Sequence, residues 1–281
     1  MKKILLPTDF SQPAANAFRF AVDFAKTAEA TIHLVHVIEL PVMHDTTLMP
    51  TLSFEQDYLD DATELAKKKF RQMIASVKGD AFITSSVEYG GAAPMILDAA
   101  KKQKATLIIM GTQGASGLKE FFIGSNTEKI VRLSGVPVLA VPASAAMKNV
   151  RNIILPTSLY GDADELVAQV KVLQKHFKAK LHVLYVNTPA LFRADLQSTD
   201  LLGQFVRKYQ LKDAVVHIWN DVSEESGVVN FAADLGACLV AMATHGRRGL
   251  AHLMTGSVAE DVVNHIRFPV WSAKLSAKKR R

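Results

Sequence analysis

Residues 3–8 read KILLPT, and residues 152–157 read NIILPT, at an offset of 149 residues. The same offset aligns residues 30–37 (ATIHLVHV) with residues 179–186 (AKLHVLYV) without a gap. A sequence that repeats itself over half of its length predicts two similar structural units. The chain has 281 residues, which is enough for two domains of about 140 residues each.

Towards the end of each half the offset falls to 132 residues. There Gly114, Gly124 and Ser125 correspond to Gly246, Gly256 and Ser257. The first half therefore contains extra chain, which falls around Pro41–Asp61. A lid over a ligand and an oligomer contact are both open roles for it. The repeat predicts one domain over residues 1–146, a second over residues 147–275, and a basic tail over residues 276–281.

Each half alternates short apolar runs with segments of helical spacing. In the first half the predicted strands are residues 4–6, 31–38, 82–88, 107–110 and 136–141, and the predicted helices are residues 14–27, 54–77, 93–103 and 126–133. Such alternation predicts an α/β fold with two tandem doubly wound (Rossmann-like) open parallel-sheet domains. Ligands bind outside the C-terminal ends of the strands in such sheets.

The composition indicates a soluble, cytoplasmic protein with a sizeable core. Hydrophobic residues make up 49% of the chain, and no apolar run reaches the roughly 18 residues of a membrane-spanning helix. The start of the chain has too short an apolar run for a signal peptide. The single cysteine, Cys238, lies in an apolar run, so we expect a buried thiol.

The formal net charge of +6 comes mainly from the end of the chain. Five positive charges lie in the last eight residues, at Lys274, Lys278, Lys279, Arg280 and Arg281. Basic tails can bind nucleic acid. We expect this tail to be a solvated end instead, with neither nucleic acid nor a membrane as a partner.

Residues 111–128, GTQGASGLKEFFIGSNTE, follow a predicted strand and lead into a predicted helix. Backbone N–H groups at a helix start are unsatisfied and attract negative charge. Glycine lets the backbone come close to a ligand, so the stretch predicts a phosphate cradle. Residues 125–128 also form the S-x-x-E pattern of a capping box, which is a purely structural alternative. The sequence contains neither the P-loop pattern nor G-x-G-x-x-G.

Four features together resemble a tandem member of the universal stress protein family. They are ILLPTD at residues 4–9, the strand ending His36-Val37, the pattern G-x2-G-x9-G-[ST] filled by Gly111, Gly114, Gly124 and Ser125, and VPVLAV at residues 136–141. The resemblance covers essentially the whole chain, twice. The glycine pattern resembles the members of the family that bind ATP.

The resemblance implies roles for individual residues. Asp9 would bind the adenosine part through the ribose hydroxyls, Val37 would line the adenine pocket, and Met110 would pack near the nucleoside. The phosphates would be held by Gly111, Gly114, Gly124, Ser125 and Asn126. The implied cofactor is ATP, alone or with Mg²⁺ on its phosphates. The histidines show no zinc-binding spacing, so no metal site of the protein itself is expected.

The second half departs from this pattern at two positions. Ser158 stands where the first half has Asp9, and Ala243 stands where it has Gly111. If that glycine position needs a positive φ, alanine costs about 1–2 kcal/mol there. Cations in residues 244–248 offer partial compensation or a site for a different anion. We expect ATP in the first half and weak or no binding in the second.

The family also implies that the final strands of the two halves pair, here residues 136–141 with residues 269–273. The two domains would then form a pseudo-dimer within one chain, and a further homodimer stays open. The favoured function is a stress-response protein that binds ATP in its first domain and acts as a sensor or regulatory interaction protein. A slow ATPase without an evident catalytic residue and a nucleotide-free scaffold are the alternatives. The sequence names no protein partner.

Overall fold

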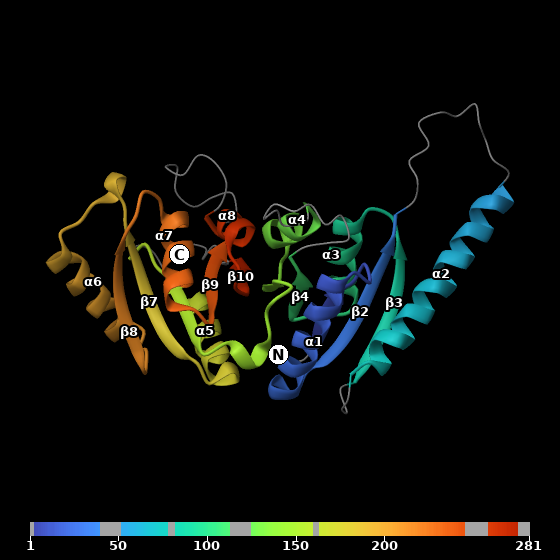
Figure 1. Cartoon of the computed structure of the whole chain (residues 1–281), viewed down its shortest axis with the longest axis horizontal. Helices are drawn as coiled ribbons and strands as arrows, with labels where there is room; N and C mark the ends of the chain where they lie inside the picture. The colour runs from blue at the N-terminus through green and yellow to red at the C-terminus, as the bar shows by residue number, and fades with distance from the viewer. Residues whose placement is uncertain are drawn as a thin grey trace, which may run out of the picture.

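The ten strands among the described residues lie in one sheet, in the order β3-β2-β1-β4-β5-β10-β9-β6-β7-β8, and Figure 1 shows how this sheet runs across both halves. The structure is a computed structural model, and it describes residues 3–39, 52–77, 82–112, 125–159, 163–244 and 258–274. The first half contains β1 (Lys3–Pro7), α1 (Gln12–Ala28), β2 (Thr31–Ile38), α2 (Leu52–Ala75), β3 (Ile83–Tyr89), α3 (Ala92–Lys102), β4 (Leu107–Gly111), α4 (Ser125–Leu133) and β5 (Val138–Val141). The second half contains η1 (Met147–Asn149), β6 (Asn152–Pro156), α5 (Asp164–Phe177), β7 (Lys180–Asn187), η2 (Pro189–Leu191), α6 (Asp195–Lys208), β8 (Ala214–Asn220), α7 (Glu224–Leu235), β9 (Cys238–Thr244), α8 (Val258–His265) and β10 (Val270–Lys274).

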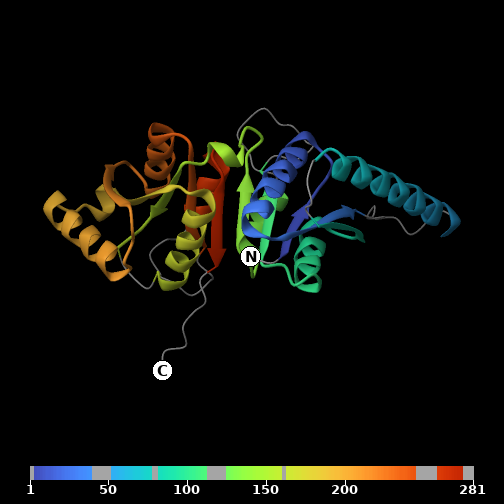
Figure 2. The same ribbon diagram turned by 90° about the horizontal axis from the view of Figure 1, so that it is seen from below.

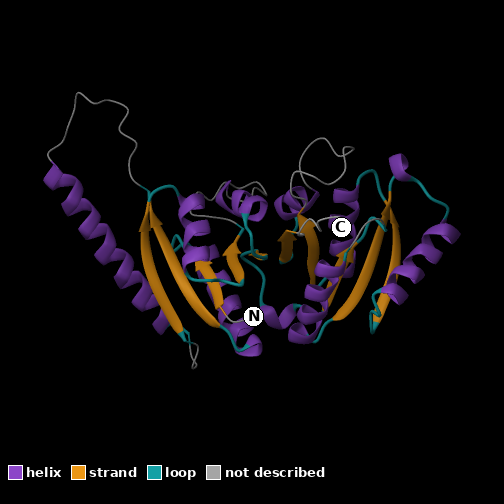
Figure 3. Ribbon diagram, turned by 180° about the vertical axis from the view of Figure 1, so that it is seen from behind, coloured by secondary structure: helices purple, strands orange, loops and turns teal. Residues whose placement is uncertain are grey.

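Within each half the neighbouring strands are parallel. Leu5 of β1 lies opposite His33 of β2 on one side and Ile108 of β4 on the other. Helices flank both faces of the strands (Figure 3), which explains why β1 and β4 are almost uninterrupted apolar runs. The predicted doubly wound α/β fold with two tandem units is confirmed.

The two half-sheets join through their last strands. β5 and β10 pair antiparallel, with Leu139 opposite Trp271 and Ala140 opposite Val270, and Figure 2 shows these strands side by side at the centre of the molecule. Trp271 is 0% exposed, and its indole Nε1–H donates to Oε1 of Gln169 on α5 over 3.1 Å. The predicted pairing of the final strands, and with it the pseudo-dimer within one chain, is confirmed.

The two faces of the sheet have differently organised cores. One hydrophobic cluster contains residues of α1, α2, α5 and α6 and runs beneath both halves. On the other face α3 and α4 cover one cluster, and α7 and α8 cover a separate one. One continuous cluster therefore runs beneath both halves on the first face, whereas on the other face the halves meet only near the joint, where Ala140 of β5 belongs to the cluster of the second half.

α1 shows how the sequence sets a helix boundary. The Ser11 hydroxyl accepts a hydrogen bond from the Ala14 N–H at 3.3 Å, and Pro13 lies in the first turn, where its missing N–H costs nothing. The residue that follows the helix, Glu29, has a left-handed φ of 49° and so stops it. Its repeat equivalent Lys178 follows α5 with a φ of 51°.

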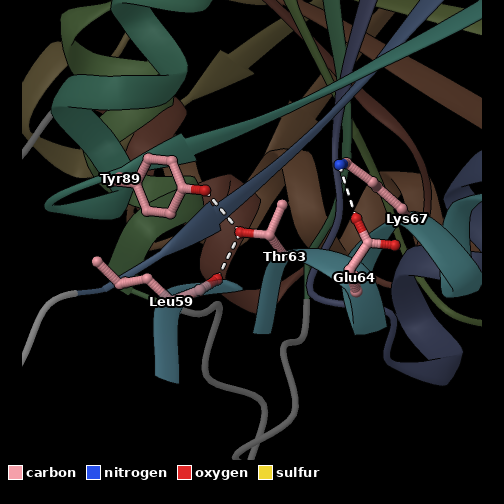
Figure 4. Close-up of polar contacts among 5 residues, drawn as sticks. All are labelled: Leu59, Thr63, Glu64, Lys67 and Tyr89. Atoms are coloured by element: carbon pink, nitrogen blue, oxygen red, sulfur yellow. Dashed lines mark hydrogen bonds and ion pairs between the residues drawn. The ribbon is translucent and has the colours of Figure 1, made fainter. Parts of the chain in front are cut away.

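α2 accounts for part of the extra length of the first half, because it has 24 residues and α6 has 14. Figure 4 shows how it is tied to the edge strand β3: the hydroxyls of Thr63 and Tyr89 lie 2.6 Å apart. The Thr63 hydroxyl also donates to the carbonyl of Leu59. The exposed ion pair of Lys67 with Glu64 contributes little to stability.

A short connector links the halves, since β5 ends at Val141 and β6 begins at Asn152. The Asn16 side chain of α1 donates to the carbonyl of Ala143 over 2.6 Å, which holds the connector against the first half. Among the described residues, no helix combines the length and apolarity that a membrane span requires.

Replacing Trp271 with alanine tests the shared core. The change should lower the free energy of unfolding by about 3–5 kcal/mol, because it opens a cavity at the joint and leaves Gln169 without its donor. Chemical denaturation would measure it. Val172→Ala, at a 43% exposed position of α5, is the control, and a loss below about 1 kcal/mol for Trp271→Ala would contradict a shared core.

Candidate functional site

The candidate site lies where the winding direction of the first half-sheet reverses. β1 lies between β2 and β4, so the chain moves outwards from β1 through β2 to β3 and then returns to the other side of β1. Ligands in doubly wound folds bind at this switch point, outside the C-terminal strand ends. Asp9 follows the end of β1, and Gly111 is the last residue of β4, so these two predicted residues flank the switch point.

Asp9 lies in a turn that is held by its own side chains. Its Oδ1 accepts from the Ser11 N–H at 3.0 Å, and the Thr8 hydroxyl accepts from the Phe10 N–H at 3.0 Å. Phe10 has a φ of 61°, a left-handed conformation that is uncommon without glycine. Asp9 is exposed. The turn therefore presents a carboxylate to solvent at the strand end, while that same carboxylate also supports the start of α1.

His36 on the neighbouring strand β2 holds this turn in place, a role that the sequence did not predict. Its Nδ1 donates to the Thr8 carbonyl over 2.8 Å, which fixes the tautomer because a carbonyl only accepts. The Phe10 ring packs against the His36 ring with centroids 4.6 Å apart and against Phe70 of α2 at 5.2 Å. The position of Asp9 thus depends on β2 and α2 as well as on β1.

Gly111 makes room for α1. A Cβ atom at this position would lie 3.1 Å from the Pro13 carbonyl oxygen and 3.2 Å from the Pro13 carbonyl carbon. Gly111 is not among the described residues with a positive φ. Alanine would therefore cause no backbone strain at this position. Glycine is needed here because the start of α1 comes too close for a Cβ atom.

The start of α4 is bound to the end of β4 by Thr127. The buried Thr127 hydroxyl donates to the Gly111 carbonyl over 3.0 Å. This contact holds the first turn of α4, with the unsatisfied N–H groups of Ser125 and Asn126, beside the strand end. The second half has Ala259 at the equivalent position and so lacks the hydroxyl. Sequence reasoning missed Thr127, although it lies inside the S-x-x-E pattern.

The remaining predicted residues are divided between the described and undescribed parts of the chain. Val37 is half-buried near the end of β2, and Met110 is buried beneath the end of β4. Asn126 is half-buried in the first turn of α4. Gly114 and Gly124 lie outside the described residues, as does the tail of residues 276–281. The structure therefore brings Asp9, Val37, Met110, Gly111 and the start of α4 to neighbouring strand ends.

The second half keeps the turn and changes its surroundings. The Thr157 hydroxyl accepts from the Leu159 N–H at 3.0 Å, and Leu159 has a φ of 64°, as in the first half. α1 begins at Gln12, which corresponds to position 161, but α5 begins only at Asp164. The later start is consistent with Ala243, because at the equivalent Gly111 a Cβ atom would come within 3.1 Å of the start of α1.

The end of β7 is covered by the segment that follows it. The Tyr185 hydroxyl donates to the Leu191 carbonyl over 3.1 Å. The buried Asn187 amide bonds the backbone of Arg193 in both directions and also contacts Asn220. Val186, which corresponds to Val37, is 6% exposed. The strand end that corresponds to the predicted adenine pocket is therefore closed by the second half's own chain.

The buried histidines are structural, and among the described residues no cluster of three or more metal-ligating side chains occurs. His33 Nδ1 lies 2.8 Å from the Thr84 hydroxyl. Its repeat equivalent His182 has Nε2 3.1 Å from Asn152 Oδ1 and Nδ1 2.9 Å from Nε2 of His217. Burial raises the pKa of the Cys238 thiol to about 12, so this thiol is also inert.

Comparison with known proteins identifies both halves. The model of the universal stress protein family matches residues 1–142 and again residues 149–274. A universal stress protein of Methanocaldococcus jannaschii is 31% identical over 140 residues, covering 50% of this chain and 81% of its own. Universal stress protein YxiE of Bacillus subtilis is 31% identical over 144 residues, covering 50% of this chain and 97% of its own.

A solved structure matches the whole arrangement. A universal stress protein from Archaeoglobus fulgidus superposes with a TM-score of 0.73 at 20% identity, covering 97% of this chain and 98% of its own. At this identity the match supports the fold alone. The tandem arrangement of two such units therefore also occurs in a protein of known structure.

Thr127→Val should lower the free energy of unfolding by about 1–2 kcal/mol, because a buried hydroxyl is lost and the Gly111 carbonyl loses its donor. Chemical denaturation measures the effect. Thr199→Val on the exposed surface of α6 should change stability by less than about 0.5 kcal/mol. Equal effects of the two changes would show that the link between α4 and β4 adds no stability.

Acid should destabilise the protein through His182. Burial and the charges of His217 and Lys180 lower the pKa of His182 to about 4. From about pH 6.5 downwards the unfolded chain takes up a proton that the folded protein accepts only near pH 4, so stability falls as the pH falls through this window. We expect a loss of about 2 kcal/mol between about pH 7.5 and pH 5. Chemical denaturation at several pH values, with His182→Gln as the comparison, measures it; an unchanged slope in the variant would contradict the assignment.

Proposed function

This chain belongs to the universal stress protein family, and from that premise we propose that its first half binds ATP and that the protein acts as a nucleotide-responsive regulator. The observation that carries the proposal is the convergence of Asp9, Gly111 and the start of α4 at the switch point of the first half-sheet. Asp9 and the start of α4 supply polar groups that a nucleotide needs, and Gly111 accepts the Thr127 hydrogen bond that holds α4 beside the strand end.

The chemistry of these groups fits an adenine nucleotide. The Asp9 carboxylate has about four acceptor positions, so it can take ribose hydroxyls in addition to the Ser11 N–H. The first turn of α4 offers N–H groups and a helix dipole to phosphate oxygens. Apolar Val37 and Met110 would border the nucleoside. Mg²⁺ would sit on the phosphates, since it keeps waters and uses few protein ligands.

The second half fits a nucleotide less well, which supports a single site for each chain. Ser158 offers no carboxylate to the ribose. Ala259 cannot form the hydroxyl link that holds α4 beside β4. The end of β7 is covered by the contacts of Tyr185 and Asn187. We assign to this half the role of a fixed partner that completes the sheet.

The regulatory part of the proposal follows from where α4 lies. α4 packs beside α8 of the second half (Figure 1). A triphosphate bound at the start of α4 would order that turn, and the effect would reach the joint between the halves. A protein partner that contacts α4 and α8 would then distinguish the loaded protein from the empty one.

The test is nucleotide extraction from freshly purified protein, followed by titration of the stripped protein with ATP. Wild type should carry and bind ATP, and Asp9→Ala should weaken binding about tenfold or more, because hydrogen bonds to a charged group are lost. Ser158→Ala, at the equivalent position of the second half, is the matched control and should leave affinity unchanged.

Two outcomes would overturn the proposal. Wild type that neither carries nor binds ATP would point to a nucleotide-free scaffold. Equal losses for Asp9→Ala and Ser158→Ala would show that the first half is not the site. Release of ADP on incubation with Mg-ATP, measured in the same samples, would assign a slow ATPase activity to the site in addition to binding.

A further inference from the structure

A concave site lies in the second half, at the N-terminal ends of β7 and β8. It has a volume of about 690 Å³ and lies between the end of α5 and the turn that precedes β8. The Gln174 side chain donates to the Lys212 carbonyl over 3.3 Å and ties the two walls together. The lining includes five lysines, namely Lys171, Lys175, Lys178, Lys180 and Lys212.

The charges around this basic pocket are strongly unbalanced. All five lysines are exposed, and Asp213 is the single carboxylate in the lining. Within the described part of the chain, none of the five ammonium groups forms an ion pair with a carboxylate. Like charges that line one pocket repel one another, so a multivalent anion would relieve a repulsion that no ion pair among the described residues neutralises.

The repeat shows that the fold does not require these charges. At an offset of 149 residues, Lys171, Lys175, Lys178 and Lys180 correspond to Val22, Lys26, Glu29 and Thr31. These four positions thus carry four positive charges in the second half, but only one positive and one negative charge in the first half. Lys175 and Lys178 also lie near the end of α5, where cations stabilise a helix, but Lys180 begins β7 and Lys212 precedes β8. The helix end alone does not explain the set.

We propose that the basic pocket binds a compact oligophosphate, meaning a small molecule with two or more neighbouring phosphate groups. The cavity volume lies within the range of small-ligand sites, about 300–1,000 Å³. Lysine ammonium groups bind phosphate as mobile point charges. The lining contains no aromatic side chain on which a nucleobase could stack, so the chemistry favours phosphate groups over single-stranded nucleic acid.

This site is separate from the proposed nucleotide site. It lies at the N-terminal ends of strands in the second half, whereas Asp9 and Gly111 lie at the C-terminal ends of strands in the first half. An oligophosphate in the basic pocket would therefore not compete with a nucleotide for the same residues. The second half would then have a ligand of its own although its nucleotide site is altered.

The binding test uses inorganic tripolyphosphate as the probe and the full chain in low salt, by calorimetry. Wild type should bind saturably, and affinity should fall as salt is added. Lys180→Glu with Lys212→Glu should weaken binding at least about tenfold. Lys101→Glu with Lys148→Glu, two exposed lysines of the first half and the connector, changes the net charge equally and should leave the affinity within about twofold.

A second measurement maps the site without any substitution and separates it from phosphate binding in the first half. Acetylation of lysines, read by peptide mass spectrometry, should show protection of Lys175, Lys180 and Lys212 by tripolyphosphate, and none of Lys101 or Lys148. Unprotected pocket lysines, absence of saturable binding, or equal losses in both double variants would overturn the proposal. Tighter binding of an oligonucleotide or of anionic vesicles than of tripolyphosphate would overturn the ligand class.

Discussion

The antiparallel pairing of β5 with β10 is the contact on which the rest of the arrangement depends. Each half is an open parallel sheet, and its last strand would otherwise expose a row of unpaired N–H and C=O groups. The pairing satisfies those groups, buries Trp271 and Leu139, and lets one apolar cluster run beneath both halves. Among the described strands, β3 and β8 remain as the edges of one continuous sheet.

The residues that form the sheet are constrained in both halves. The residues outside it, at the strand ends, can therefore differ between the two copies of the fold. The buried strands and the left-handed turn residues Phe10 and Leu159 are alike in both halves. The strand ends differ, because a glycine in one half gives way to an alanine in the other and the neighbouring helix begins later. Such differences affect what the molecule can bind and leave the sheet intact.

Much of the fold could be predicted from the sequence, because the positions of the strands and helices are recorded locally as apolar runs and helical spacing, and the repeat shows that there are two units. The predicted helix at residues 54–77 is α2 at Leu52–Ala75, and the predicted strand at residues 136–141 begins at Val138. The supports of the candidate site could not be predicted. Thr127 meets the carbonyl of a residue 16 positions away, and His36 meets one 28 positions away, and such distances follow only from the folded chain. The packing role of Gly111 was also hidden, since glycine serves equally for tight turns and close approach.

The short connector between Val141 and Asn152 has a consequence for how the molecule is assembled. Two halves on one chain meet at an effective concentration of the order of millimolar for a short linker, so dilution in the cell cannot separate them. Separate single-domain subunits would exchange and form mixed and matched pairs. Here every molecule contains one half of each kind, and their one-to-one stoichiometry is set when the chain is synthesised.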